Sequence, residues 1–239
     1  MTATLAALLL PGLMCDQRIW AGQMDTLAPL GARAIPGYNG ANTLQAMAAH
    51  VLAAAPPRFA LAGHSMGARV ALEVVRAAPD RVVRLALLDT GTHPVQPGEA
   101  DKRYALLALG RQKGVEALVD AWLPPMVSPR HRENAALVKR MRDMAIEAGV
   151  DQFAAQIAAL LSRPELESFL PTIAIPTLVG VGRDDEWSPI SQHQDIVAAI
   201  PNSHLTIFEN AGHMAPMEAP EAVTAALKDW LVAGQDGDR

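Results

Sequence analysis

The sequence predicts an α/β fold, in which a mostly parallel six-stranded sheet carries helices on both faces. Short apolar runs alternate with helical patterns along the chain, which is typical of parallel strands joined by crossover helices. The runs are apolar at nearly every position, as expected for strands that are covered on both faces. With 50% apolar and 19% charged residues over 239 positions, the chain also has the composition of a globular protein rather than a disordered one.

The predicted elements follow in order along the chain. Thr43 is a suitable N-cap for a helix that ends near residue 54, and Pro79 ends the helix that starts at Met66. The terminal segment 234–239 is expected to be frayed. The strands are predicted at 5–10, 32–35, 59–63, 82–88, 177–182 and 204–208, and the helices between them at 43–54, 66–77, 190–199 and 221–232.

Residues 94–171 break this alternation, because the segment contains helical patterns and no convincing strand. The predicted helices are 104–109, 115–122, 134–148 and 152–161. In the third, the apolar residues gather on one face and the charged residues on the other. We therefore expect a helical insertion between the fourth and fifth strands, with residues 1–93 and 172–239 forming the core.

Composition argues against several classes of protein. A net charge of −5 provides no basic surplus for binding nucleic acid, and a single cysteine, Cys15, is incompatible with a disulfide framework or a cysteine-ligated zinc site. No apolar stretch reaches the roughly 18 residues that a membrane span needs. The apolar run 1–10 has no preceding Lys or Arg and no cleavage site after it, so a buried strand is favoured over a signal peptide. The expected location is the cytoplasm.

The clearest chemical motif is Gly63-His64-Ser65-Met66-Gly67, which lies between a predicted strand and a predicted helix. A sharp turn there strains the backbone and exposes the serine hydroxyl beyond the end of the sheet. The flanking glycines are needed because side chains at those positions would collide with neighbouring backbone. The pattern predicts that Ser65 is a nucleophile and that the Met66 amide can stabilise an oxyanion.

A nucleophilic serine needs a base and an acid that orients the base. Of the seven histidines, His213 follows the last predicted strand and so lies at the same edge of the sheet as Ser65. Asp184, Asp185 and Glu186 follow the fifth strand, and Asp89 follows the fourth. From position alone, any of these four carboxylates could reach the imidazole. The other histidines have ordinary structural explanations, and His131 and His193 are expected at the surface.

The loop after the first strand is predicted to complete the oxyanion site. Gly12 lets this loop turn, and Leu13 is then the expected donor of the second N–H group.

Together these motifs resemble the α/β-hydrolase family, over nearly the whole chain. Residues 63–67 are similar to its nucleophile elbow, 182–189 to its acid loop and 212–221 to its histidine loop, in the family's order. The register of the acid loop, with three residues from Gly182 to the acid and four more to Pro189, implies Asp185. The helical insertion would then be the family's cap. Two departures are the replacement of the usual His-Gly of the oxyanion loop by Pro11-Gly12, and a start at what resembles the family's third strand.

The resemblance implies a serine hydrolase that cleaves a small to medium carboxylic ester through an acyl-enzyme. Lactone, thioester or carbon–carbon bond hydrolysis and perhydrolysis are alternatives on the same fold, and a non-catalytic ligand receptor is an alternative from another class. No cofactor, metal, nucleic acid or membrane partner is expected. Met14 and Met214, with Met141 and Met144 of the insertion, are expected to form an adaptable apolar pocket that favours uncharged acyl groups.

Overall fold

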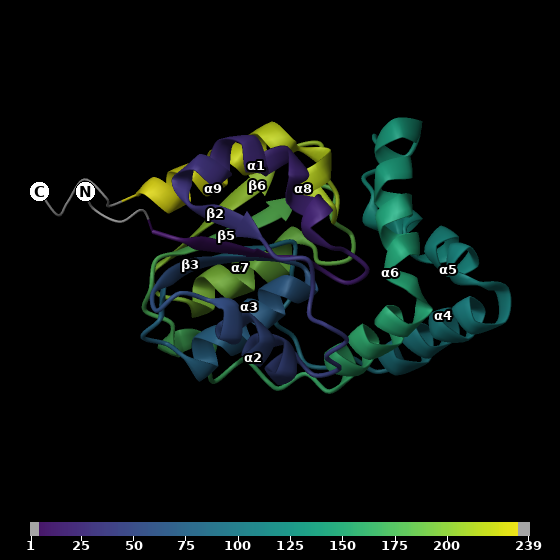
Figure 1. Ribbon diagram of the computed structural model, residues 1–239, viewed down its shortest axis with the longest axis horizontal. Helices are drawn as coiled ribbons and strands as arrows, with labels where there is room; N and C mark the ends of the chain where they lie inside the picture. Colours follow the sequence, from purple (N-terminus) through teal and green to yellow (C-terminus); the bar gives the residue numbers. More distant parts are fainter. Residues whose placement is uncertain (1–4, 234–239) are drawn as a thin grey trace, which may run out of the picture.

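Six parallel strands form one sheet in the computed structural model, which describes residues 5–233 (Figure 1). The strand order is β2-β1-β3-β4-β5-β6, and each neighbouring pair is parallel. The predicted α/β class and the predicted number of strands are confirmed. The predicted frayed segment 234–239 lies outside the described residues. The strands are β1 Ala7–Leu10, β2 Ala32–Ala34, β3 Phe59–His64, β4 Val82–Leu88, β5 Thr177–Gly182 and β6 Ser203–Phe208.

Helices cover both faces of this sheet. Figure 1 shows α1 (Ala21–Leu27) and α9 (Pro220–Val232) above it, and α2 (Leu44–Ala54), α3 (Met66–Ala77) and α7 (Ile190–Ala199) below it. A short helix, α8 (Ala215–Glu218), precedes α9. Every residue of β1, β3 and β5 is buried, which explains why these strands are apolar throughout. Thr43 caps α2 as predicted, because its hydroxyl accepts a hydrogen bond from the Ala46 amide.

Three helices lie between β4 and β5, and we call the segment Glu99–Leu161 the cap. The cap consists of α4 (Glu99–Lys113), α5 (Val115–Trp122) and α6 (Ala135–Leu161), and it lies at one side of the sheet layers (Figure 1). The first cap helix is longer than the predicted 104–109. The two helices predicted at 134–148 and 152–161 form the two parts of α6, which is interrupted at Gly149 (φ 81°, ψ 166°).

The α6 helix also corrects one expectation. It contains an 18-residue window with a mean hydropathy of 1.2, so by length and composition alone it qualifies as a membrane-spanning helix. The non-helical backbone at Gly149 divides it, however, and neither part is as long as the roughly 20 residues that span a bilayer. Apolar side chains from both parts, including Met141, Phe153 and Ile157, are buried within the protein.

Candidate active site

The turn between β3 and α3 has the backbone strain that the Gly-x-Ser-x-Gly pattern predicts. Ser65 has φ 54° and ψ −118°, a conformation that is costly for a residue with a side chain. A Cβ at Gly63 would overlap the Gly67 carbonyl, and a Cβ at Gly67 would lie 2.5 Å from the Leu10 carbonyl oxygen. Both glycines are therefore required for the close approach of β1, β3 and α3, and this packing holds Ser65 in place.

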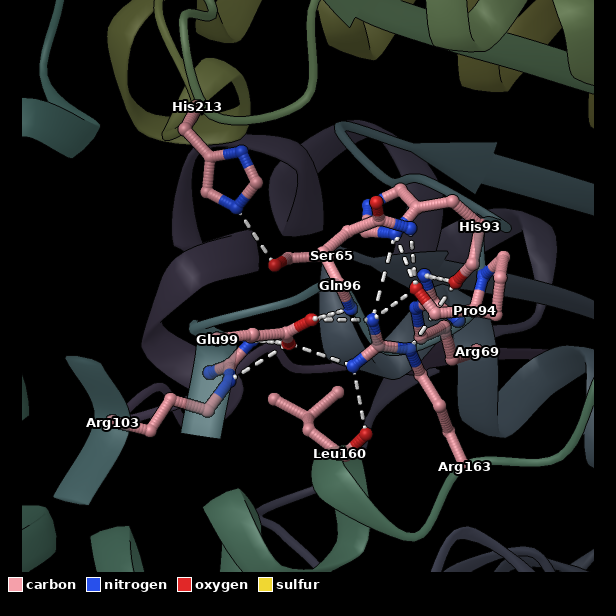
Figure 2. A network of polar contacts seen from close by, with 10 residues as sticks. All are labelled: Ser65, Arg69, His93, Pro94, Gln96, Glu99, Arg103, Leu160, Arg163 and His213. Carbon is pink, nitrogen blue, oxygen red and sulfur yellow. Dashed lines mark hydrogen bonds and ion pairs between the residues drawn. The ribbon is translucent and has the colours of Figure 1, made fainter. Parts of the chain in front are cut away.

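Three side chains from separate loops form a continuous hydrogen-bonded chain. The Ser65 Oγ atom lies 2.7 Å from His213 Nε2, and His213 Nδ1 lies 2.8 Å from Asp185 Oδ2. Because an ionised carboxylate can only accept, Nδ1 carries the imidazole proton and Nε2 accepts the hydroxyl proton of Ser65. The arrangement is therefore suited to removing that proton. Figure 2 shows the contact between Ser65 and His213.

The structure separates the four carboxylates that the sequence left open, and the first of them to set aside is Glu186, which is exposed. Asp185 is the one that contacts His213, and its other oxygen accepts hydrogen bonds from the amides of Trp187 and Ser188. Asp184 instead accepts a hydrogen bond from the Ser128 hydroxyl and so braces the loop. Asp89 accepts one from the Gly182 amide, which ties the end of β4 to β5.

Burial and charge act differently on the two buried aspartates. Burial opposes ionisation of Asp185, but the charge and hydrogen bond of His213 outweigh burial and hold the pKa of Asp185 below its usual value. Burial, reinforced by the charge of Asp185, raises the pKa of Asp89 well above its usual value. Asp185 is therefore the carboxylate that can offset an imidazolium charge at His213, whereas burial disfavours the charged form of Asp89.

The loop from Pro11 to Cys15 carries the amide of Leu13, which the sequence predicts as the second N–H donor to an oxyanion. Among the described residues, neither the Leu13 nor the Met66 N–H has a protein acceptor, and both residues line the same cavity as Ser65. The loop is held from two sides. Tyr38 donates a hydrogen bond to the Pro11 carbonyl at 2.7 Å, and Gln156 of α6 accepts one from the Met14 amide at 2.9 Å. These contacts fix a loop that lacks the histidine often found in this position of the family.

Three buried polar side chains to which the sequence assigns no role, His64, Glu218 and His193, organise the loops. His64 Nε2 donates to the His213 carbonyl oxygen at 2.7 Å, and burial lowers the pKa of His64 to about 3. Glu218 accepts hydrogen bonds from the amides on both sides of His213. His193 is fully buried rather than exposed as predicted, because its Nε2 accepts from the Thr90 amide beside the elbow.

A cavity of about 440 Å³, its mouth included, opens beside Ser65 and His213. Met214 lines it, as predicted. The sequence also predicts Met14, Met141 and Met144 in the pocket, but the structure places these side chains in the packing of the loop and the cap, where they are fully buried. Cap residues that the sequence did not single out take their place. The cavity is lined by Leu13, His64, Ser65, Met66, Arg103, Trp122, Met126, Leu160, Trp187, His213 and Met214.

The presence of Arg103 means that the pocket wall is not purely apolar. In residues 5–233, no group of three or more His, Cys, Asp or Glu side chains is arranged to hold a metal ion.

Comparison with known proteins establishes the family. The sequence profile of the alpha/beta hydrolase family matches residues 7–226, which is most of the chain. The chain therefore belongs to this family.

Similar proteins include hydrolases of different specificity. A 2-hydroxy-6-oxononadienedioate/2-hydroxy-6-oxononatrienedioate hydrolase of Pseudomonas putida is 30% identical over 73% of this chain and 63% of its own length. A pimeloyl-[acyl-carrier protein] methyl ester esterase of Aromatoleum aromaticum is 26% identical over 92% of this chain and 96% of its own. The chain thus matches under two thirds of the first of these relatives and nearly the whole of the second.

Solved structures show the same fold. A thermophilic esterase from Thermogutta terrifontis, with malate bound, has a TM-score of 0.88 and 29% identity, and the match covers 95% of this chain and 89% of the esterase. An enol-lactonase from Burkholderia xenovorans has a TM-score of 0.85 at 22% identity, covering 95% and 92% of the two chains.

Proposed function

We propose that this protein is a serine hydrolase that cleaves a small to medium carboxylic ester or related acyl compound. The observation that carries the proposal is the contact of 2.7 Å between Ser65 Oγ and His213 Nε2, at a strained elbow and with Asp185 behind the imidazole. The esterases among the similar proteins support an ester as the substrate.

The reaction follows from the positions of these groups. His213 takes the proton of Ser65 while Oγ attacks the acyl carbonyl carbon, and the carbonyl oxygen becomes an oxyanion. The free N–H groups of Leu13 and Met66 are the donors available to that oxyanion. His213 then gives its proton to the leaving alcohol, which leaves an acyl-enzyme. Water, deprotonated by His213, attacks the acyl carbon and releases the acid, and Ser65 regains its proton.

Asp185 acts on the base in this scheme. Its hydrogen bond to Nδ1 fixes the tautomer of His213, and its negative charge stabilises the imidazolium that forms when Ser65 is deprotonated.

Substitution of the nucleophile tests the proposal. Ser65→Ala is expected to lower the turnover of short-chain 4-nitrophenyl esters by roughly 10³-fold or more, because the members of such a triad act as one unit. Release of 4-nitrophenolate at saturating ester measures the effect, and the circular dichroism of both proteins controls for folding. Activity within tenfold of the unsubstituted protein would place the nucleophile elsewhere.

The alternatives are separated by the same assay with other substrates. Lactones, thioesters and carbon–carbon bonds flanked by carbonyl groups would use the same three side chains, so a panel of these compounds identifies the preferred reaction. One relative is named for hydrolysis of an oxononadienedioate, which makes such a compound a necessary member of the panel. A non-catalytic receptor would bind members of this panel and turn over none of them.

A further inference from the structure

A cluster of three arginines and one glutamate lies where the cap joins the core, next to Ser65 (Figure 2). Arg69 comes from α3, Glu99 and Arg103 from α4, and Arg163 from the segment after α6. The Glu99 carboxylate forms ion pairs with two of these arginines: its oxygens lie 2.6 Å from Arg163 and 2.9 Å from Arg103. The cluster therefore gathers residues from three segments of the chain, and two of its three arginines pair with its one carboxylate.

Arg163 has a structural role in this cluster. Its side chain is 1% exposed. Besides Glu99, it donates to the carbonyl oxygens of His93, Pro94 and Leu160. It thereby clamps the end of the cap to the segment that follows β4, and its hydrogen-bonding groups are used within the protein.

The cluster carries more positive than negative charge. It holds three guanidinium groups and one carboxylate, and besides burial the charges that act on Arg69 and Arg103 are those of Glu99 and the other arginines. Arg69 Nη1 is buried and has no hydrogen-bond partner, although Nη2 donates to the His93 carbonyl. Burial, with the repulsion of Arg163, lowers the pKa of Arg69 to about 9. Because a buried excess of positive charge is unfavourable, the cluster favours a bound anion.

Arg103 is the member of the cluster that reaches the cavity. It lines the cavity together with Ser65, His213 and Leu160, and its side chain is 11% exposed. Its Nε and Nη2 atoms contact Glu99, whereas its Nη1 atom has no protein partner among the described residues. A group bound beside Ser65 can therefore receive a hydrogen bond from this guanidinium.

We propose that Arg103 binds a carboxylate on the acyl chain of the substrate, so that the preferred substrate is a half-ester of a dicarboxylic acid. This inference rests on the proposed ester hydrolysis at Ser65. Figure 2 shows His213 on one side of Ser65 and Arg103 on the other. Since His213 protonates the leaving alcohol, that alcohol lies on the His213 side, and the acyl chain extends toward Arg103. The arginine reverses the preference for uncharged acyl groups that the methionines led us to expect.

Two matched substrates test the proposal. Mono-4-nitrophenyl adipate carries a carboxylate at the end of its acyl chain, and 4-nitrophenyl 5-carbamoylpentanoate is the uncharged amide of the same length. The measured quantity is the ratio of kcat/KM for the anionic ester to that for the amide, after subtraction of the uncatalysed rates. A charge-assisted hydrogen bond predicts a ratio of roughly ten or more.

Two substitutions of Arg103 and one control substitution test whether Arg103 causes the higher kcat/KM of the anionic ester. Arg103→Gln is expected to bring the ratio to about one, and Arg103→Lys to an intermediate value, because lysine keeps the charge and loses the planar fork. Arg111→Gln is the matched control, since Arg111 is an exposed arginine of the same helix, and it should keep the original ratio. The ratio compares two substrates in one preparation, so partial unfolding of a variant does not change it.

The outcomes that overturn the inference are distinct from failure of the proposed function. A ratio of one or less in the unsubstituted protein, or a high ratio that survives Arg103→Gln, would show that Arg103 does not select a carboxylate. In both cases the amide ester would still be hydrolysed by Ser65. If neither ester were hydrolysed, ester hydrolysis itself would be refuted, and the inference with it.

Discussion

At the scale of single residues, two buried aspartates that follow neighbouring strands have different roles. Asp185 contacts His213, whereas Asp89 Oδ2 is 3.8 Å from His64 Nε2 and has no hydrogen-bond partner. Burial raises the pKa of Asp89 and so disfavours its charge, and an amide at this position therefore removes little charge stabilisation. At position 185 an amide removes the charge that stabilises the imidazolium.

Asp185→Asn is therefore expected to lower kcat by several hundredfold or more, up to about 10⁴-fold. Asp89→Asn and Asp184→Asn should each stay within a hundredfold of the unsubstituted protein, because they act on loop packing alone. Steady-state kinetics with one neutral 4-nitrophenyl ester gives the three values. If Asp89→Asn were the crippling change and Asp185→Asn the mild one, the orienting acid would be the residue after β4.

At the scale of the elements, the loops at the strand ends are joined by buried, neutral histidines. His193 lies on α7, and its Nε2 accepts from the Thr90 amide at 2.9 Å. Its Nδ1 contacts the Pro189 carbonyl at 3.1 Å, so Nδ1 carries the proton. A protonated ring could not accept from Thr90. Burial lowers the pKa of His193 from its ordinary value of 6.5 to about 4.

This shift predicts a loss of stability in acid. As the pH falls below 6.5, the unfolded chain binds a proton at His193 that the folded chain does not bind until the pH nears 4, so protonation favours unfolding across this range. Between pH 7 and pH 4.5, the free energy of unfolding should fall by about 2 kcal/mol more in the unsubstituted protein than in His193→Gln.

Urea denaturation at a series of pH values measures this difference. His50→Gln is the control, because His50 is an exposed histidine on α2, and it should keep the slope of the unsubstituted protein. Equal slopes for His193→Gln and the unsubstituted protein would mean that His193 is not held neutral by the fold.

At the scale of the whole molecule, the features that can be predicted from the sequence are those whose signal lies in adjacent residues. The strand at 177–182 has the predicted bounds because its apolar run is bounded by Pro176 on one side and by the polar segment 183–186 on the other. The elbow could be recognised because its glycines, its strand and its helix are adjacent in the chain. The shared edge of Ser65, His213 and the candidate acids could be predicted because parallel strands place their carboxyl ends together, whereas the choice of Asp185 among those acids came from the family resemblance.

The contacts of the cap could not be predicted in this way. Gln156 reaches the Met14 amide across 142 positions of sequence, and Arg163 reaches Glu99 across 64. An apolar stripe indicates that a helix is packed, but it does not say which neighbour it packs against. For that reason Met141 and Met144 were assigned to the pocket, whereas the structure places Arg103 there.

Covalent labelling tests most directly whether Ser65 is an activated nucleophile. A fluorophosphonate reacts with a serine that a neighbouring base deprotonates and spares an ordinary hydroxyl. Intact-protein mass spectrometry should detect one adduct per chain, and peptide mapping should assign it to Ser65. Ser65→Ala should remain unlabelled, and His213→Ala should label far more slowly. An adduct on another residue, or a folded protein that does not react, would contradict the assignment of Ser65 as the nucleophile.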